Sequence, residues 1–312
     1  MNVRKREVMF YVAVGRKRIG KTHQTILVIE RYWRIGNPSV GLKPRKVLIF
    51  DVNNEYSQYN PIYADAESIK RFSAHPKIEC RRVSPKKPNG KIKSRKDFQQ
   101  DLINILENFK SGLLVLEDLS LLVGDAVSQD LVGRLCTHAH NDIDIITHFQ
   151  MISKSAHPKF KPLTTIVRLH KTTDSSNRPS VKKNLGDDYS KVRIGELIIN
   201  NRYNIGISKM TELEVKGRGR GDKEYDYWDF NYQRFYLHID YNDHKIIGGF
   251  SREEFDLACK RYLQEEVRDE INPMLTYKDA NGKYEYTYKT AFEYKMKELG
   301  RFYGNKDNGN KC

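Results

Sequence analysis

The chain has 312 residues, of which 38% are hydrophobic and 30% charged, and it carries a formal net charge of +15 at pH 7. This length accommodates one α/β core and a smaller second domain. No run approaches the ~18 consecutive apolar residues of a membrane span, and the surplus of positive charge favours a polyanionic partner.

The cysteines and the N-terminus restrict the possible classes of protein further. Cys80, Cys136, Cys259 and Cys312 form no CxxC pair, which indicates neither a zinc site nor a disulfide framework. The apolar run at 8–14 is short and leads into a glycine loop, which favours a buried strand over a signal peptide. We therefore expect a cytoplasmic protein, in the host cytoplasm if it is viral, with no membrane segment.

Apolar runs alternate with helical patterns over the first two-thirds of the chain. Such alternation predicts βαβ units and a mainly parallel sheet whose strands are buried on both faces. The predicted strands are 8–14, 46–50, 112–116, 143–150 and 165–169, and the predicted helices are 22–34, 97–109 and 129–138.

The character of the sequence changes after about Tyr203. A basic glycine-rich stretch at 216–221 is expected to be flexible, and a hairpin is predicted from strands at 234–240 and 245–247. Ser251 and Glu254 form a capping box that opens a helix to about residue 268. The Tyr- and Lys-rich tail, 277–312, is expected to be partly disordered. These features predict a core over 1–205 and a small α+β domain over 206–312.

The segment 15–22, which we call the phosphate loop, matches G-x-x-x-x-G-K-[ST] between a predicted strand and a predicted helix. Its glycines let backbone N–H groups point at phosphate oxygens, and the helix N-terminus adds its positive end. Lys21 would reach the β- and γ-phosphates of ATP and Thr22 would hold Mg²⁺. The predicted nucleotide-binding residues are Gly15, Arg16, Lys17, Arg18, Ile19, Gly20, Lys21 and Thr22. The three basic residues at 16–18 either face the triphosphate or a neighbouring subunit, or are solvated loop charge.

An acidic pair, Glu117 and Asp118, ends the apolar strand at 112–116. This arrangement is typical of a Walker B strand, in which one carboxylate holds the Mg²⁺ shell and the next orients or deprotonates the attacking water. The usual order is Asp then Glu. By position, Glu117 takes the metal, partly through water, and Asp118 the water.

Two further strand ends carry a resemblance to a known superfamily. Asp51 to Tyr56 resembles the D-x-x-x-E-Y signature of HerA-type ATPases, and Gln150 resembles the polar end of the sensor strand in the HerA/FtsK superfamily. The resemblance covers about residues 8–203. It implies a RecA-like P-loop core, site roles for Glu55 and Gln150, and a homo-oligomeric ring, a hexamer or pentamer, on double-stranded DNA. Alternatively, Asp51 and Glu55 are ordinary polar loop residues with a capping role, and Gln150 ends a strand with a hydrogen bond to a neighbour.

Ring ATPases of this kind complete each site with an arginine from the adjacent subunit. The resemblance implies a position before the sensor strand, where Arg134 is the candidate. Arg168 and Arg178 are alternative candidates for this arginine. Arg134 can also be an ordinary arginine on a helix surface.

A basic stretch at 81–96 contains eight cations, no acid, and the proline and glycine of a loop. Such a loop can hold DNA phosphates without reading sequence, or it can be a solvated surface loop. The predicted DNA-binding residues are Arg81, Arg82, Lys86, Lys87, Lys91, Lys93, Arg95 and Lys96.

Together these features predict an ATPase that translocates double-stranded DNA. A short chain without a membrane span most resembles the viral genome-packaging group, and a portal or capsid protein is the further partner that this resemblance implies. The alternatives are a DNA-translocating ATPase of conjugation or replication, a nucleotide-dependent switch without motor activity, and, least supported, a small-molecule kinase.

Overall fold

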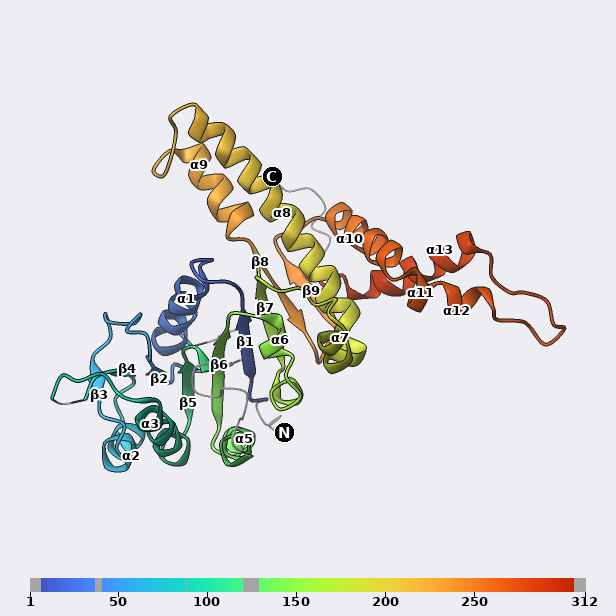
Figure 1. Ribbon diagram of the computed structural model, residues 1–312. Helices are drawn as coiled ribbons and strands as arrows, with labels where there is room; N and C mark the ends of the chain where they lie inside the picture. Colours follow the sequence, from blue (N-terminus) through green and yellow to red (C-terminus); the bar gives the residue numbers. More distant parts are fainter. Residues whose placement is uncertain (1–6, 37–40, 88, 120–128, 306–312) are drawn as a thin grey trace. The chain divides into compact units, whose positions relative to one another are not determined.

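The computed structural model describes residues 7–36, 41–87, 89–119 and 129–305 (Figure 1). Helices and strands alternate along most of this length, so the protein has a mixed α/β fold with mostly parallel strands, as the sequence predicts. The chain divides into two compact units, Met1–Ile166 and Val167–Cys312.

The first unit contains a parallel sheet with the strand order β3-β4-β2-β5-β6-β1. Its strands are β1 (Phe10–Val14), β2 (Lys46–Phe50), β3 (Pro61–Ile62), β4 (Cys80–Val83), β5 (Gly112–Leu116) and β6 (Ile143–Phe149). Its α-helices are α1 (Lys21–Arg34), α2 (Ala66–Ala74), α3 (Arg95–Asn108), α5 (Gln129–Cys136) and α6 (Ile152–Ser155).

The register of this sheet brings the ends of its strands together. Phe50 pairs with Leu116, Leu116 with Thr147, and Val14 with Phe149. Because all of these strands run in the same direction, the residues that follow them share one edge of the sheet. The phosphate loop and the acidic pair therefore meet at this edge.

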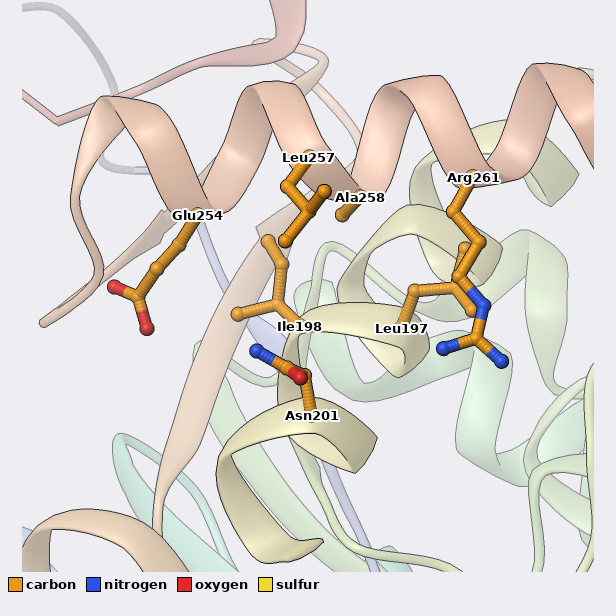
Figure 2. Close-up of a pocket in the computed structure, with 7 residues that line it drawn as sticks. All are labelled: Leu197, Ile198, Asn201, Glu254, Leu257, Ala258 and Arg261. Carbon is orange, nitrogen blue, oxygen red and sulfur yellow. The ribbon is translucent and has the colours of Figure 1, made fainter. Parts of the chain in front are cut away.

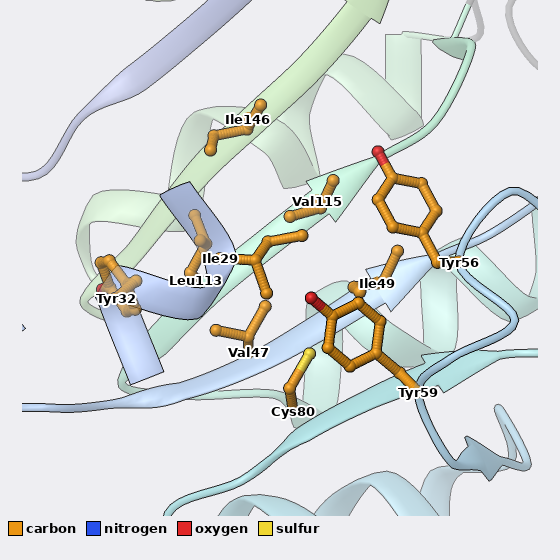
Figure 3. Close-up of a cluster of buried hydrophobic side chains, with 10 residues drawn as sticks. All are labelled: Ile29, Tyr32, Val47, Ile49, Tyr56, Tyr59, Cys80, Leu113, Val115 and Ile146. Carbon is orange, nitrogen blue, oxygen red and sulfur yellow. The ribbon is translucent and has the colours of Figure 1, made fainter. Parts of the chain in front are cut away.

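Apolar side chains alternate between the two faces of the central strands. On one face, Val47 and Ile49 of β2 belong to a cluster with Ile29 and Tyr32 of α1 (Figure 3). On the other face, the Phe50 ring meets Phe98 of α3 edge-on, with 5.8 Å between ring centroids. This double burial explains the continuous apolar runs of the strands.

Local signals set the helix starts in this unit. Ser94 and Asp97 form a capping box, so α3 begins at Arg95, two residues before the predicted start. Asp65 caps α2 by accepting a hydrogen bond from the Ser68 backbone N–H. The elements α2, β3 and β4 were not predicted from the sequence.

The second unit begins within β7 (Ile166–His170), and its strands β8 (Tyr236–Asp240) and β9 (Lys245–Gly248) form an antiparallel hairpin. The predicted hairpin is therefore confirmed. Its α-helices are α7 (Pro179–Leu185), α8 (Tyr189–Val215), α9 (Lys223–Trp228), α10 (Arg252–Glu265), α11 (Val267–Glu270), α12 (Asn272–Leu275) and α13 (Tyr288–Leu299).

Helices α8 and α10 pack against each other in this unit. The guanidinium of Arg202 on α8 makes a two-pronged ion pair with Glu254 on α10, at 2.6 and 2.7 Å. The cavity between these helices is lined by Ile198, Leu257 and their neighbours and has a volume of about 40 Å³ (Figure 2). That space suits water and is far below the roughly 300 Å³ of a small-molecule site.

The sequence raises expectations for two segments of this unit. The tail contains the helix α13, capped by Thr287; residues 306–312 lie outside the described part, and the partial disorder expected for 277–312 stays a prediction. The stretch 216–221 forms the turn between α8 and α9, with Gly217 and Gly221 at positive φ. Residue 205 lies inside α8, and the domain boundary assigned there stays a prediction.

Among the described residues, no helix has both the length and the apolar character that a membrane span requires.

Close packing at the start of β5 yields a first prediction. A Cβ added to Gly112 would lie 2.7 Å from the Lys46 carbonyl oxygen and 2.6 Å from the Phe109 ring. We expect Gly112→Ala to lower the free energy of unfolding by about 1–3 kcal/mol, measured by urea denaturation. Gly133→Ala on α5 is the control, because no atom of the described residues lies within 4 Å of its added Cβ; an equal loss in both variants would contradict the prediction.

Candidate nucleotide-binding site

The phosphate loop connects the buried end of β1 to the start of α1, as predicted. Its Gly15 N–H donates to the Phe149 carbonyl at the end of β6, at 3.1 Å. Gly20 has a φ of 93°, a left-handed conformation that favours glycine, and directly precedes the first turn of α1. Ile19 is buried and anchors the loop. The loop is therefore tied at both ends to the carboxyl edge of the sheet.

The Lys21 ammonium curls back over this loop. Its Nζ donates to the backbone carbonyls of Gly15 at 2.6 Å and Arg16 at 2.9 Å. The positive charge thus lies inside the curve of the loop, where phosphate oxygens would be held. Lys17 and Arg18 are exposed, and Arg18 has a φ of 62°.

Glu55 reaches the first turn of α1 from the segment after β2. The Thr22 hydroxyl donates to Glu55 Oε2 at 2.5 Å. Asp51, at the end of β2, accepts the backbone N–H groups of Glu55 at 2.8 Å and Tyr56 at 3.2 Å. The D-x-x-x-E-Y spacing therefore has a physical reason, because the Asp side chain fixes the turn that presents the Glu.

Asp51 also holds a cation from the neighbouring strand β4. The Arg82 guanidinium lies 3.2 Å from Asp51 Oδ2 and donates to Asn54 Oδ1 at 2.9 Å and to the Tyr59 carbonyl at 3.0 Å. Burial raises the pKa of Asp51, and this effect outweighs the opposing backbone hydrogen bonds and the charge of Arg82. Arg82, which the sequence assigned to DNA, is thus part of the carboxylate network.

Glu117 is 4% exposed at the end of β5. Its Oε2 lies 3.1 Å from Nδ1 of His148 on β6. Burial raises the pKa of Glu117, but the charge of His148, the Tyr56 hydroxyl and the charge of Lys21 together bring it below its ordinary value. Figure 3 shows the Tyr56 hydroxyl directed toward the end of β5. Glu117 is therefore an ionised, buried carboxylate beside the phosphate loop.

Asp118 faces a different partner from its neighbour. The Gln150 side-chain amide donates to Asp118 Oδ2 at 2.9 Å. Gln150 directly follows β6, so the amide and the carboxylate come from adjacent strands. The acidic pair and the expected sensor residue are thus brought together.

The oxygen atoms at this edge fit a magnesium ion. Thr22 Oγ1 and the carboxylates of Glu55 and Glu117 are hard oxygen donors, which Mg²⁺ prefers, and it is usually bound through one or two carboxylates with retained waters. The residues predicted for the metal, Thr22 and Glu117, therefore suit it chemically, and Glu55 adds a third oxygen donor.

The candidate trans arginines occupy three different environments. Arg134 pairs with Glu107 of α3 near the end of α5. Both helices end just before a strand begins, so this pair lies at the edge opposite to the phosphate loop. Arg168 on β7 is 2% exposed, whereas Arg178, before α7, is exposed. The role predicted for Arg134 is to complete the nucleotide site of a neighbouring subunit, and this assignment stays a prediction.

The basic stretch 81–96 begins in β4 and ends in α3. Between them, Lys86 and Ile92 form an antiparallel bridge that makes a short hairpin. Several cations have acidic partners: Arg81 with Glu79, Lys87 with Asp97, and Lys93 with Asp101. The exposed cations of this stretch are Lys86, Lys91, Arg95 and Lys96.

Sequence reasoning assigned no role to His148 or Thr25. His148 Nε2 lies 2.8 Å from Thr25 Oγ1, while its Nδ1 faces Glu117. Both residues are almost completely buried. The available signal was a histidine inside a strand that the sequence predicts to be buried on both faces, because a buried polar side chain needs a partner.

Comparison of this chain with known proteins found similarity only to solved structures. No protein-family model and no curated protein sequence matches the chain. The chain is similar to the genome-packaging NTPase B204 from Sulfolobus turreted icosahedral virus 2 in complex with AMPPCP, with a TM-score of 0.43 and 14% identity, over 78% of this chain and 99% of that chain. The same NTPase in complex with ATP-gammaS gives a TM-score of 0.44 and 14% identity, over 78% and 98%.

A second, more distant likeness is to the N-terminal domain of zonular occludens toxin from Neisseria meningitidis. Its TM-score is 0.29 with 16% identity, over 52% of this chain and 76% of that chain. The packaging NTPase belongs to the group that the sequence resemblance names. Likeness at these TM-scores carries no weight for function, which rests on the site's own residues.

The Asp51 network yields the second prediction. Arg82→Ala would leave a buried carboxylate without its cation, so we expect the free energy of unfolding to fall by about 3 kcal/mol. The adjacent Arg81→Ala is the control, because Arg81 pairs with Glu79 nearer the surface and should cost at most about 1 kcal/mol. Urea denaturation measures both, and equal losses would show that Asp51 does not depend on Arg82.

Proposed function

We propose that this protein is a magnesium-dependent P-loop ATPase that moves double-stranded DNA, as in viral genome packaging. The observation that carries the ATPase part is the convergence of Lys21, Thr22, Glu117 and Gln150 at one edge of a parallel sheet. Phosphate binding needs the loop and the lysine, while hydrolysis needs a placed acid and an oriented water. All of these groups belong to the first unit.

Each side chain has a distinct task in this proposal. The loop N–H groups and Lys21 bind and orient the β- and γ-phosphates, and they stabilise charge that develops during transfer. Thr22 and Glu117 hold Mg²⁺, which supplies electrostatic stabilisation of the transferring phosphoryl group. Asp118, fixed by Gln150, orients or deprotonates the attacking water. Gln150 can thereby sense the state of the γ-phosphate.

The proposed DNA contact is the exposed part of the basic hairpin. Lys86 and Lys91 lie at the hairpin, and Arg95 and Lys96 begin α3. Lysine and arginine in such positions bind the phosphate backbone independently of sequence. With the net charge of +15, this surface supports a polyanionic substrate.

A homo-oligomeric ring is part of the same proposal. Arg134 of one subunit would complete the site of the next, and a portal or capsid protein would anchor the ring during packaging. A DNA translocase of conjugation or replication would use the same residues. A nucleotide-dependent switch would use the phosphate loop without stimulation by DNA.

The third prediction tests the motor directly. ATP hydrolysis should be stimulated severalfold by long double-stranded DNA, and Lys21→Ala should lower the rate about 100-fold or more, because it removes a donor aimed at developing charge. Phosphate release is measured with and without DNA. Lys70→Ala is the control, since Lys70 is an exposed lysine on α2, outside the phosphate loop. A hydrolysis rate that DNA does not change would reject the DNA translocase and favour the nucleotide-dependent switch.

The fourth prediction concerns the basic hairpin. Replacing Lys86 and Lys91 by Ala should weaken DNA binding and reduce the slope of log K against log salt by about 2, roughly one per lost phosphate contact. Fluorescence anisotropy over a salt series measures the slope. The control removes two exposed lysines of the second unit, Lys260 and Lys289. Equal slopes in both double variants would place the DNA elsewhere.

A further inference from the structure

We propose that His148 is a positioning residue that fixes the Glu117 carboxylate, and that Thr25 in turn orients His148. This inference rests on the proposed ATPase function and adds two side chains to its machinery. The imidazole lies between the two groups: Nε2 is hydrogen-bonded to Thr25 Oγ1 at 2.8 Å, and Nδ1 lies 3.1 Å from Glu117 Oε2 in a close polar contact that is not aligned as a hydrogen bond. We call these three residues the relay.

The relay is shielded from water. Thr25 is 0% exposed, His148 1% and Glu117 4%. In such surroundings a polar contact is stronger than at the surface, and an unpaired polar group is costly. Histidine suits the position because its two ring nitrogens point in different directions and can serve two partners at once.

The relay joins three elements of the site. Thr25 follows Thr22 by three residues on α1, so both hydroxyls lie on the same side of the helix. His148 comes from β6 and Glu117 from the end of β5. The acid is thereby tied to the helix that carries Lys21 and Thr22. A side-chain link of this kind fixes the distance between the two oxygen donors proposed for Mg²⁺.

A glutamate at this position has a particular need for such a link. Compared with the more usual aspartate, its carboxylate stands on one additional rotatable bond. Without a partner, the carboxylate could occupy several rotamers, and only some of them would suit the metal. The contact with His148 selects one of them. Loss of a residue that orients a metal ligand in this way typically lowers metal affinity by about 10–100-fold.

Substitutions can separate the two sides of the imidazole. His148→Asn retains a donor near the position of Nδ1, which faces Glu117, whereas His148→Gln retains one near Nε2, which faces Thr25. Thr25→Val removes the hydroxyl at nearly constant volume, and Thr25→Ser restores it. His138→Asn is the matched control, because His138 is a buried histidine whose Nδ1 contacts the Leu135 carbonyl and whose ring meets Phe10, outside the relay.

The measurements are the rate of ATP hydrolysis, the Mg²⁺ concentration that half-saturates binding of a fluorescent ATP analogue, and binding of the analogue in EDTA. For His148→Gln we expect the half-saturating Mg²⁺ concentration to rise about tenfold or more, with binding in EDTA unchanged. His148→Asn should be closer to the wild type. Thr25→Val should show a smaller rise, which Thr25→Ser reverses.

Thermal unfolding separates positioning from packing. If Thr25→Val and His148→Gln lower the midpoint but leave the Mg²⁺ requirement and the rate unchanged, the relay is structural and the proposal is overturned. A smaller rise in the half-saturating Mg²⁺ concentration for His148→Gln than for His148→Asn would also overturn the proposal. If the wild type binds the analogue with Mg²⁺ but hydrolyses no ATP, the proposed function fails, while the Mg²⁺ dependence still decides the role of His148.

Discussion

The parallel pairing of β2, β5, β6 and β1 is the constraint on which the site depends. Four neighbouring strands run in one direction and end within two residues of one another, so the residues that follow them must share an edge. Burial on both faces fixes that register, because a slip of one residue would turn every side chain to the opposite face. Asp51, Glu117 and Gln150 are therefore brought together by the backbone, before any side chain recognises another.

Gathering carboxylates at one edge creates an electrostatic problem, and the structure solves it locally. A buried carboxylate is costly unless it is paired or hydrogen-bonded. Asp51 has Arg82 and two backbone N–H groups, Glu117 has His148, and Asp118 has Gln150. Each acid thus has its own partner from a neighbouring strand or turn. The supporting residues are as necessary to the site as the acids are, because without them the acids would repel one another or take up protons.

The sequence predicts the parts of this arrangement that depend on local pattern. Apolar runs located the central strands within about two residues, and the spacing of glycine, lysine and threonine located the phosphate loop. Partnerships across strands left no local signal, so Arg82 was grouped with the basic loop although it pairs with Asp51. Helix α8 escaped prediction because its first half is buried on all sides and shows no single apolar stripe.

The reversed order of the acidic pair has an explanation in the backbone. In an extended strand, two consecutive side chains point to opposite faces. Here the strand ends at Leu116, and Asp118 has a φ of 44°, a left-handed conformation that Asp tolerates better than most residues. The chain turns at this point, so Glu117 remains directed toward His148 while Asp118 meets Gln150.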